Sequence, residues 1–270
     1  MKVEDLKIIL DAHKLWDDSD GKEGKRADLS NANLSNANLS NANLRYADLS
    51  NADLSNAYLR YADLRDADLR RADLRDADLR DADLRYADLR YAELSNADLS
   101  NANLWNANLR NANLRYANLR DADLRYADLS NADLWRADLR YANLRNANLR
   151  YADLSNANLW RADLRDADLR DADLRYADLR YADLSNANLW NANLSYSIGN
   201  NKEIKSLQAG VYLISYTNES MAIGCKQHTI KKWANFTDEE ISDMDGHVAD
   251  FWTKWKPILK QIGVFDGVEI

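Results

Sequence analysis

The 270-residue sequence has little cysteine, proline or glycine: one Cys, one Pro and eight Gly. A single cysteine, Cys225, excludes an intramolecular disulfide and any cysteine-rich metal site. No apolar run reaches the length that a membrane span requires. The first residues carry Glu4 and Asp5 in a short apolar segment, which is unlike a signal peptide. We therefore expect a cytoplasmic protein without membrane association.

A dominant charge of one sign is also missing. The 36 Lys and Arg residues are mixed with 44 Asp and Glu residues, which leaves a net charge of −8. This balance disfavours a strongly basic nucleic-acid-binding protein. The sequence contains no phosphate-binding loop, nucleophile elbow or metal-binding signature. We therefore predict no catalytic residues, no cofactor and no metal.

Cys225 and His228 form the only close pair of cysteine and histidine. Two ligands are too few for a zinc site, which needs about four. Residues three apart on a strand point to opposite faces, and Cys225 would share its face with Ile223. The pair is therefore interpreted as structural, with Cys225 buried.

The middle of the chain repeats with a period of five residues. Each unit has Ala, then Asp or Asn with two exceptions, then Leu, then two variable residues. In total, 34 units follow one another without insertion from Ala27 to Tyr196. A period of five fits neither an α-helix nor a flat strand. If the chain bends once per unit, four units make a square coil that points every Ala and Leu at one axis. Stacked coils would then pair as parallel strands about 4.8 Å apart.

These units strongly resemble the pentapeptide-repeat proteins, over about two thirds of the chain. The resemblance implies a right-handed, four-sided parallel β-helix with Ala and Leu inside and the other three positions outside. We thus predict an all-β solenoid of about 8.5 coils over residues 27–196. It also implies a possible function, because several members mimic DNA and bind DNA gyrase.

In a coil of four units, residues 20 apart lie above one another. One outward column then contains Arg45, Arg65, Arg85, Trp105, Arg125, Arg145 and Arg165. The column, called the arginine column below, could bind an anionic polymer. The alternative, which we favour, is a mesh of salt bridges with the neighbouring Asp and Asn residues. Eleven Tyr at the last position of units and four Trp after the leucine also lie outside. The four Trp fall on four different faces and form no single stacking platform.

The flanks are predicted to cap the coil ends, where open strand edges invite aggregation. Residues 1–26 comprise an amphipathic helix over residues 2–16 and a polar linker. Residues 197–270 predict a small α+β cap. It has a hairpin of residues 210–216 and 221–230, a Thr237–Glu240 capping box before a helix ending near Gly246, and an apolar helical stripe that Pro257 should kink or interrupt. Trp252 and Trp255 in this stripe belong to the cap core or to a homodimer interface. Both flanks resemble those of phage and prophage members of the family.

We predict a non-enzymatic, rigid scaffold that binds an unidentified protein partner through its surface or its C-terminal cap. Two alternatives are gyrase binding by DNA mimicry and nucleic-acid binding by the arginine column. The outer positions of the repeats hold 22 Arg and 27 acidic residues, a net charge of −5. Duplex DNA carries roughly 24 charges over the expected length of about 40 Å. The array also lacks the projecting loops of gyrase-protecting relatives, so gyrase binding is disfavoured.

Overall fold

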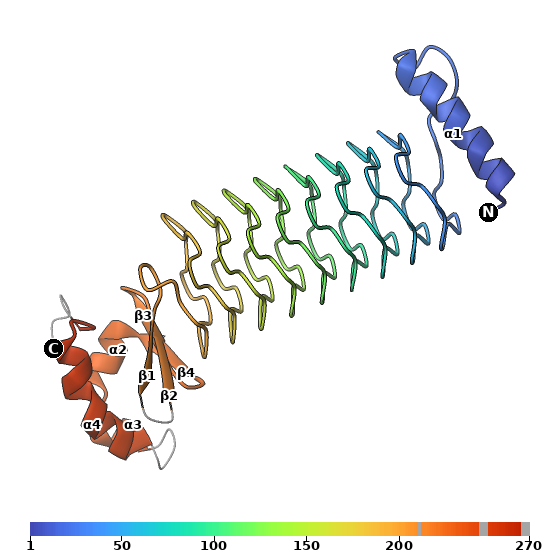
Figure 1. The fold of residues 1–270 in the computed structure, drawn as a ribbon. Coiled ribbons are helices and arrows are strands. Elements are labelled where there is room, and N and C mark those ends of the chain that lie inside the picture. The colour runs from blue at the N-terminus through green and yellow to red at the C-terminus, as the bar shows by residue number, and fades with distance from the viewer. Residues whose placement is uncertain (210–211, 243–247, 266–270) are drawn as a thin grey trace.

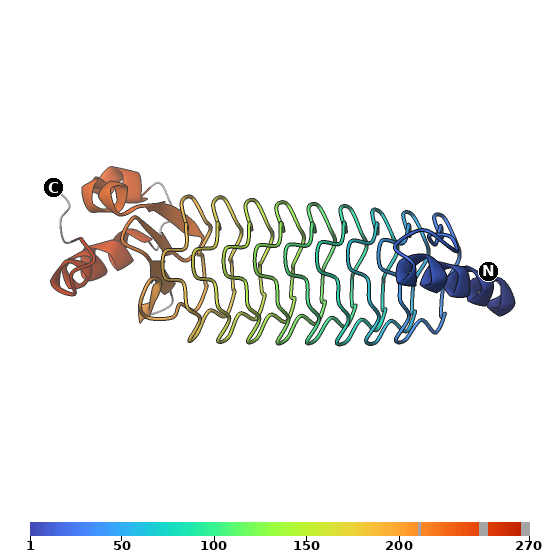
Figure 2. The same ribbon diagram turned by 90° about the horizontal axis from the view of Figure 1, so that it is seen from above.

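The computed structural model describes residues 1–209, 212–242 and 248–265. It shows a straight rod of stacked four-sided coils, a helix across the N-terminal end and a small α+β unit at the C-terminal end (Figure 1). Seen from above, the coils are evenly stacked and no loop projects from residues 27–196 (Figure 2). This is the right-handed β-helix that the repeat predicts.

The inside of the rod is a column of leucine and alanine. Every repeat leucine except Leu189 is at most 2% exposed, and most repeat alanines are equally buried. Because each leucine lies above the one 20 residues earlier, every coil covers the apolar surface of the previous coil. The core is therefore continuous along the rod, and no single coil is stable alone.

The stacking register is 20 residues throughout, from the bridge Asp28–Asp48 to the bridge Asp178–Ile198. In the middle of the rod, the Leu104 N–H donates to the Asp123 carbonyl at 2.7 Å, and the Asp123 N–H donates to the Ala102 carbonyl at 3.0 Å. The residue at the last position of each unit adds a third bond, as Asn106 does to Arg125 at 2.9 Å. Three backbone bonds per unit thus join successive coils.

Each corner of the square is a turn whose third residue has a positive φ. The Ala107 N–H donates to the Leu104 carbonyl at 3.0 Å, and Asn106 between them has φ 57°. A positive φ at the third residue alone defines a type II turn, and asparagine tolerates it well. Tyrosines at this position, such as Tyr126 with φ 61°, adopt the same conformation.

The Asp or Asn before each leucine accepts a hydrogen bond from the N–H two residues further on. Asn103 Oδ1, for example, accepts the Trp105 N–H at 3.1 Å. The bond occurs in 32 of the 34 units. The two other units have Tyr58 and Glu93 at this position. The repeat thus uses Asp and Asn because their short side chains satisfy the one N–H that the backbone leaves free.

Helix α1 (Val3–Asp18) covers the first coil, as predicted. Leu6, Ile9 and Leu10 pack against the hydrophobic core of the rod. The fully buried His13 accepts the Ala27 N–H at its Nδ1 atom, at 3.1 Å. Asp17 accepts a bond of 2.8 Å from the Asn43 side chain. The helix therefore satisfies polar groups of the open edge as well as covering its apolar centre.

The coil geometry continues slightly beyond Tyr196. Ile198 still forms the bridge with Asp178, but Gly199 stands where the next leucine would be. A Cβ atom on Gly199 would lie 2.1 Å from the Ile204 carbonyl oxygen, so only glycine fits there. The fully buried Ile204 side chain replaces the leucine and closes the core.

The C-terminal unit contains an antiparallel sheet in the order β1-β2-β3-β4. Its strands are β1 (Lys205–Ala209), β2 (Tyr212–Tyr216), β3 (Ser220–Ile223) and β4 (Lys226–Thr229). Three helices follow: α2 (Ile230–Asn235), α3 (Asp238–Ser242) and α4 (Val248–Gln261). The β2–β3 hairpin confirms the prediction. However, β1 was not predicted, and a turn at Gly224 divides the predicted second strand into β3 and β4.

The helices of this unit confirm part of the prediction. Thr237 and Glu240 form the capping box, with reciprocal bonds of 3.0 and 3.2 Å between side chain and backbone N–H. The predicted end of this helix near Gly246 lies outside the described residues. Helix α4 continues through the exposed Pro257, so the predicted interruption is wrong.

Candidate interaction surfaces

The structure aligns the arginine column on one side of the rod and pairs each of its arginines with an acid. Arg85 lies 2.5 Å from Asp83, Arg125 lies 2.7 Å from Asp123, and Arg165 lies 2.5 Å from Asp163. The remaining pairs are Arg45–Asp17, Arg65–Asp63 and Arg145–Asp166. The column is thus a mesh of ion pairs.

The electrostatics of the mesh agree with this geometry. A hydrogen bond from Arg165 holds the pKa of the Asp163 carboxyl below its usual value, and the same bond raises the pKa of Arg165. Exposed pairs of this kind are individually worth about 1 kcal/mol or less. The ion pairs mainly reduce the ability of this surface to bind anions. Each guanidinium is already neutralised by a neighbouring acid and is therefore less available to a phosphate.

Trp105 interrupts the arginine column and joins tyrosines of the two adjacent coils. Its ring contacts Tyr86 at 4.8 Å and Tyr126 at 6.2 Å, both edge to face. Trp160 repeats the arrangement on another face with Tyr141 at 4.9 Å and Tyr181 at 6.0 Å. The sequence correctly places the four Trp on different faces, but it did not predict these three-ring clusters. Offsets of 19 and 21 residues between Trp and Tyr are the signal that could have identified them.

Arginines lie against two of the four tryptophan rings. The Arg161 guanidinium lies 4.5 Å from the Trp160 ring centre, and Arg136 lies 4.4 Å from that of Trp135. The tyrosines remain accessible, and Tyr181 is 72% exposed. Both clusters are therefore rigid groups with exposed aromatic rings, and the Trp160 cluster also holds a cation. Aromatic and arginine side chains dominate binding energy at protein interfaces.

The tryptophans of α4 have different environments. Trp252 is 2% exposed and its ring lies 5.1 Å from that of Trp233, so it belongs to the core of the C-terminal unit. This burial agrees with the first of the two interpretations of Trp252, a place in the cap core. Trp255 is partly exposed and stacks on Phe251 at 6.0 Å. Only Trp255 of the two presents surface to a partner.

Cys225 and His228 do not form a site. The prediction that Cys225 is buried is wrong: it is exposed, because it lies in the turn between β3 and β4 and not within a strand. The partly buried His228 ring packs against Trp233 and Phe236. Within residues 1–209, 212–242 and 248–265, no group of three or more His, Cys, Asp or Glu side chains could hold a metal ion.

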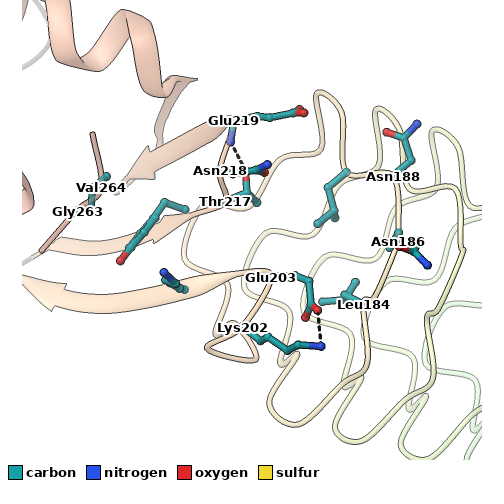
Figure 3. A pocket seen from close by; sticks show the side chains of 14 residues that line it. Leu184, Asn186, Asn188, Lys202, Glu203, Thr217, Asn218, Glu219, Gly263 and Val264 are labelled. Atoms are coloured by element: carbon teal, nitrogen blue, oxygen red, sulfur yellow. Dashed lines mark hydrogen bonds and ion pairs between the residues drawn. The ribbon is translucent and has the colours of Figure 1, made fainter. Parts of the chain in front are cut away.

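A cleft of about 740 Å³ separates the last coil from the C-terminal sheet. Its floor is the coil segment from Leu184 to Leu189, and the β2–β3 turn with Thr217 and Glu219 forms one wall (Figure 3). On the opposite wall, Lys202 and Glu203 form an ion pair of 3.0 Å. The sequence did not predict this cleft, because it forms between parts that only the tertiary structure brings together.

Comparison with known proteins identifies the family. The sequence model of the family described as pentapeptide repeats matches the chain in eight copies. The matches cover residues 25–60, 62–101, 92–131, 117–155, 127–166 and 152–191. The chain therefore belongs to the pentapeptide-repeat family. No match was found among curated protein sequences.

Several solved structures are similar. HetL, a pentapeptide-repeat protein involved in the regulation of heterocyst differentiation in the cyanobacterium Nostoc, is 37% identical. The alignment covers 74% of this chain and 98% of HetL, with a TM-score of 0.40. QnrB1, a plasmid-mediated fluoroquinolone resistance protein, is 20% identical over 64% of this chain and 84% of its own, with a TM-score of 0.45. A pentapeptide-repeat protein from the thylakoid lumen of Arabidopsis thaliana is 28% identical over 44% and 68%, with a TM-score of 0.32. None of these three supports the predicted phage resemblance.

Among the residues that the structure describes, no helix has both the length and the apolar composition that are needed to cross a bilayer.

Proposed function

We propose that this protein is a non-catalytic, rigid rod that binds a protein partner. The observation that carries the proposal is the set of exposed clusters around Trp105 and Trp160. Both tryptophans are held edge to face between two tyrosines, so little conformational entropy is lost when a partner packs on them. The straight rod would present these two clusters at a fixed separation and on two different faces.

The charge of the rod supports a protein partner over a nucleic acid. The arginine column is closed by ion pairs, and the outer positions of the repeats carry a net charge of only −5. The same value argues against DNA mimicry, since duplex DNA of similar length carries roughly 24 negative charges. Fluoroquinolone resistance, the property given for QnrB1, is therefore not proposed here. The regulatory involvement of HetL is compatible with a binding role.

The test uses the full-length protein immobilised and exposed to a bacterial lysate. We expect a discrete protein to be retained after nuclease treatment and, once purified, to bind again in a fixed ratio. Retention that depends on nucleic acid would contradict the proposal. Clear inhibition of supercoiling in a purified gyrase assay at micromolar concentrations of the rod would show that the charge argument against DNA mimicry is wrong.

Variants at the corner position make the test specific. Replacing Tyr86, Tyr126, Tyr141 and Tyr181 by Asn removes the exposed rings while keeping a residue suited to positive φ. We expect this variant to fold normally and to bind the purified partner at least about tenfold more weakly. The matched control replaces Asp81 and Asp121 by Asn at the same type of position, and its affinity should be unchanged. Equal affinities for the two variants would place the partner away from the clusters.

A further inference from the structure

Residues after Tyr196 contact three of the four sides of the last coil. On the first side, the Leu179 N–H donates to the Ile198 carbonyl at 2.8 Å. On the second, the Asn200 side-chain amide donates to the Ala182 carbonyl at 3.0 Å, and Ile204 covers the core. The Leu184 N–H of this side has no hydrogen-bond partner among the described residues. These contacts therefore replace part of those that a further coil would make.

The fourth side shows this replacement most clearly. The Gln227 side chain accepts the Leu194 N–H at 2.8 Å and donates to the Ala192 carbonyl at 2.5 Å. In mid-rod, the Leu N–H and the Ala carbonyl of one unit bond to the backbone of a single residue of the next coil. The Gln227 amide thus stands in the place of a peptide group.

The third side, residues 186–191, is left open. With respect to the residues that the structure describes, the N–H groups of Asn186, Leu189 and Asn191 and the carbonyl of Ala187 have no hydrogen-bond partner. Leu189 is also the one repeat leucine that is not buried. The open side lies on the floor of the cleft described above, so walls from the C-terminal unit flank it (Figure 3).

We propose that an extended segment of the protein partner enters this cleft and pairs as a parallel strand with residues 187–191. The proposal rests on the protein-binding function proposed above. The rod itself specifies the pairing. One residue of the segment donates its N–H to the Ala187 carbonyl, and its own carbonyl accepts the Leu189 N–H. The carbonyl of the residue two positions further along the segment accepts the Asn191 N–H. The volume of about 740 Å³ is within the range of ligand-binding clefts.

The same register defines the side chains of the segment. The residue above Ala187 faces the core and must be small, and the residue above Leu189 should be leucine, as in every other coil. Trp160 has a tyrosine on the following coil at 6.0 Å, whereas Trp190 has no following coil and is 60% exposed. An aromatic residue two positions after the leucine would pack against the exposed Trp190 ring, as Tyr181 packs against Trp160. The segment therefore has the pattern small, polar, leucine, any residue, aromatic.

The probe is a decapeptide, ADLRDADLRY, which copies residues 167–176, with both ends blocked and a fluorophore attached. We expect saturable binding to the full-length protein and slower hydrogen exchange of the Leu189 and Asn191 amides. In the matched control peptide, the backbone nitrogen of the aspartate in the second ADLR unit is methylated. This removes the N–H that would donate to the Ala187 carbonyl. We expect it to bind about tenfold more weakly or worse.

Substitutions in the protein test the aromatic position. Trp190→Ser should weaken peptide binding several-fold, since the ring is exposed and its loss leaves the fold unchanged. Trp105→Ser is the control, because that ring lies in mid-rod between two tyrosines and should not affect the peptide. Absence of binding, equal binding of the N-methylated peptide, or protection outside residues 184–194 would overturn the proposal. If a purified partner binds the protein while the peptide does not, the protein-binding function stands and the strand pairing is wrong.

Discussion

Replacing Asn143 by alanine tests whether the Asp or Asn of each unit stabilises the rod as the hydrogen bonds indicate. Its Oδ1 atom accepts the Arg145 N–H at 3.2 Å. The Arg145 side chain pairs with Asp166 at 3.4 Å, so the substitution breaks no ion pair. Leu144 next to it remains buried. The variant therefore removes one side-chain acceptor and little else.

The expected cost follows from the loss of one hydrogen bond at a partly exposed amide. A net hydrogen bond contributes about 0.5–1.5 kcal/mol. For a chain of this size, a loss of 1 kcal/mol lowers the melting temperature by about 2–4 °C. Calorimetry of the full-length protein measures this shift. Hydrogen exchange measures the local effect, and the Arg145 amide should exchange faster in the variant.

Two further variants make the reasoning refutable. Asn143→Asp keeps the acceptor and should melt close to the parent. Tyr58→Asn should supply the acceptor that the Arg60 N–H lacks and raise stability by a similar amount. If Asn143→Ala leaves both the melting temperature and the Arg145 exchange rate unchanged, the side-chain acceptor does not stabilise the corner and our explanation of the repeat is wrong.

Three other predictions concern the core and the two caps. Leu104→Asp buries an unpaired charge and should abolish cooperative unfolding in calorimetry, while Leu104→Met costs less than about 1.5 kcal/mol. Burial lowers the pKa of His13 below 6.5, so its neutral form stabilises the fold above about pH 6.5, and this stability is lost as the pH falls below that value. Exchange of α1 amides, corrected for intrinsic rates, should therefore accelerate at about pH 5 relative to a His13→Asn variant. Deleting residues 199–270 should leave folded coils that associate end to end in sedimentation, and a monodisperse monomer would contradict the capping role.

The rod could be predicted from sequence because its core needs only local information. Ala and Leu recur every five residues, and one bend per unit is the simplest way to direct both at one axis. The register of 20 then follows from the four-sided shape. The roles of the outer positions were harder to see. The Asn103 side-chain bond and the positive φ of Asn106 depend on a turn type that periodicity alone does not specify.

The C-terminal unit was predicted less well, for a physical reason. Strand β1 pairs with β2 through contacts that hydrophobic periodicity does not encode, and its sequence, KSLQA, alternates weakly. Cys225 was placed on a strand because the turn at Gly224 was not recognised. The role of the Gln227 side-chain amide, which takes the place of a backbone peptide group above the last coil, could not be predicted. It depends on how β4 lies against that coil.

The periodicity of the rod also limits where specific recognition can occur. Units that share the same core, the same turn and the same ion pairs present nearly the same surface to any partner, so a partner bound only to them could slide by one coil at little cost. Recognition at one position needs departures from the period. The four tryptophans and the open side of the last coil are such departures, and Trp190 lies where they meet. A partner that used both would be fixed along the rod as well as around it, because this open side occurs at one end of the rod.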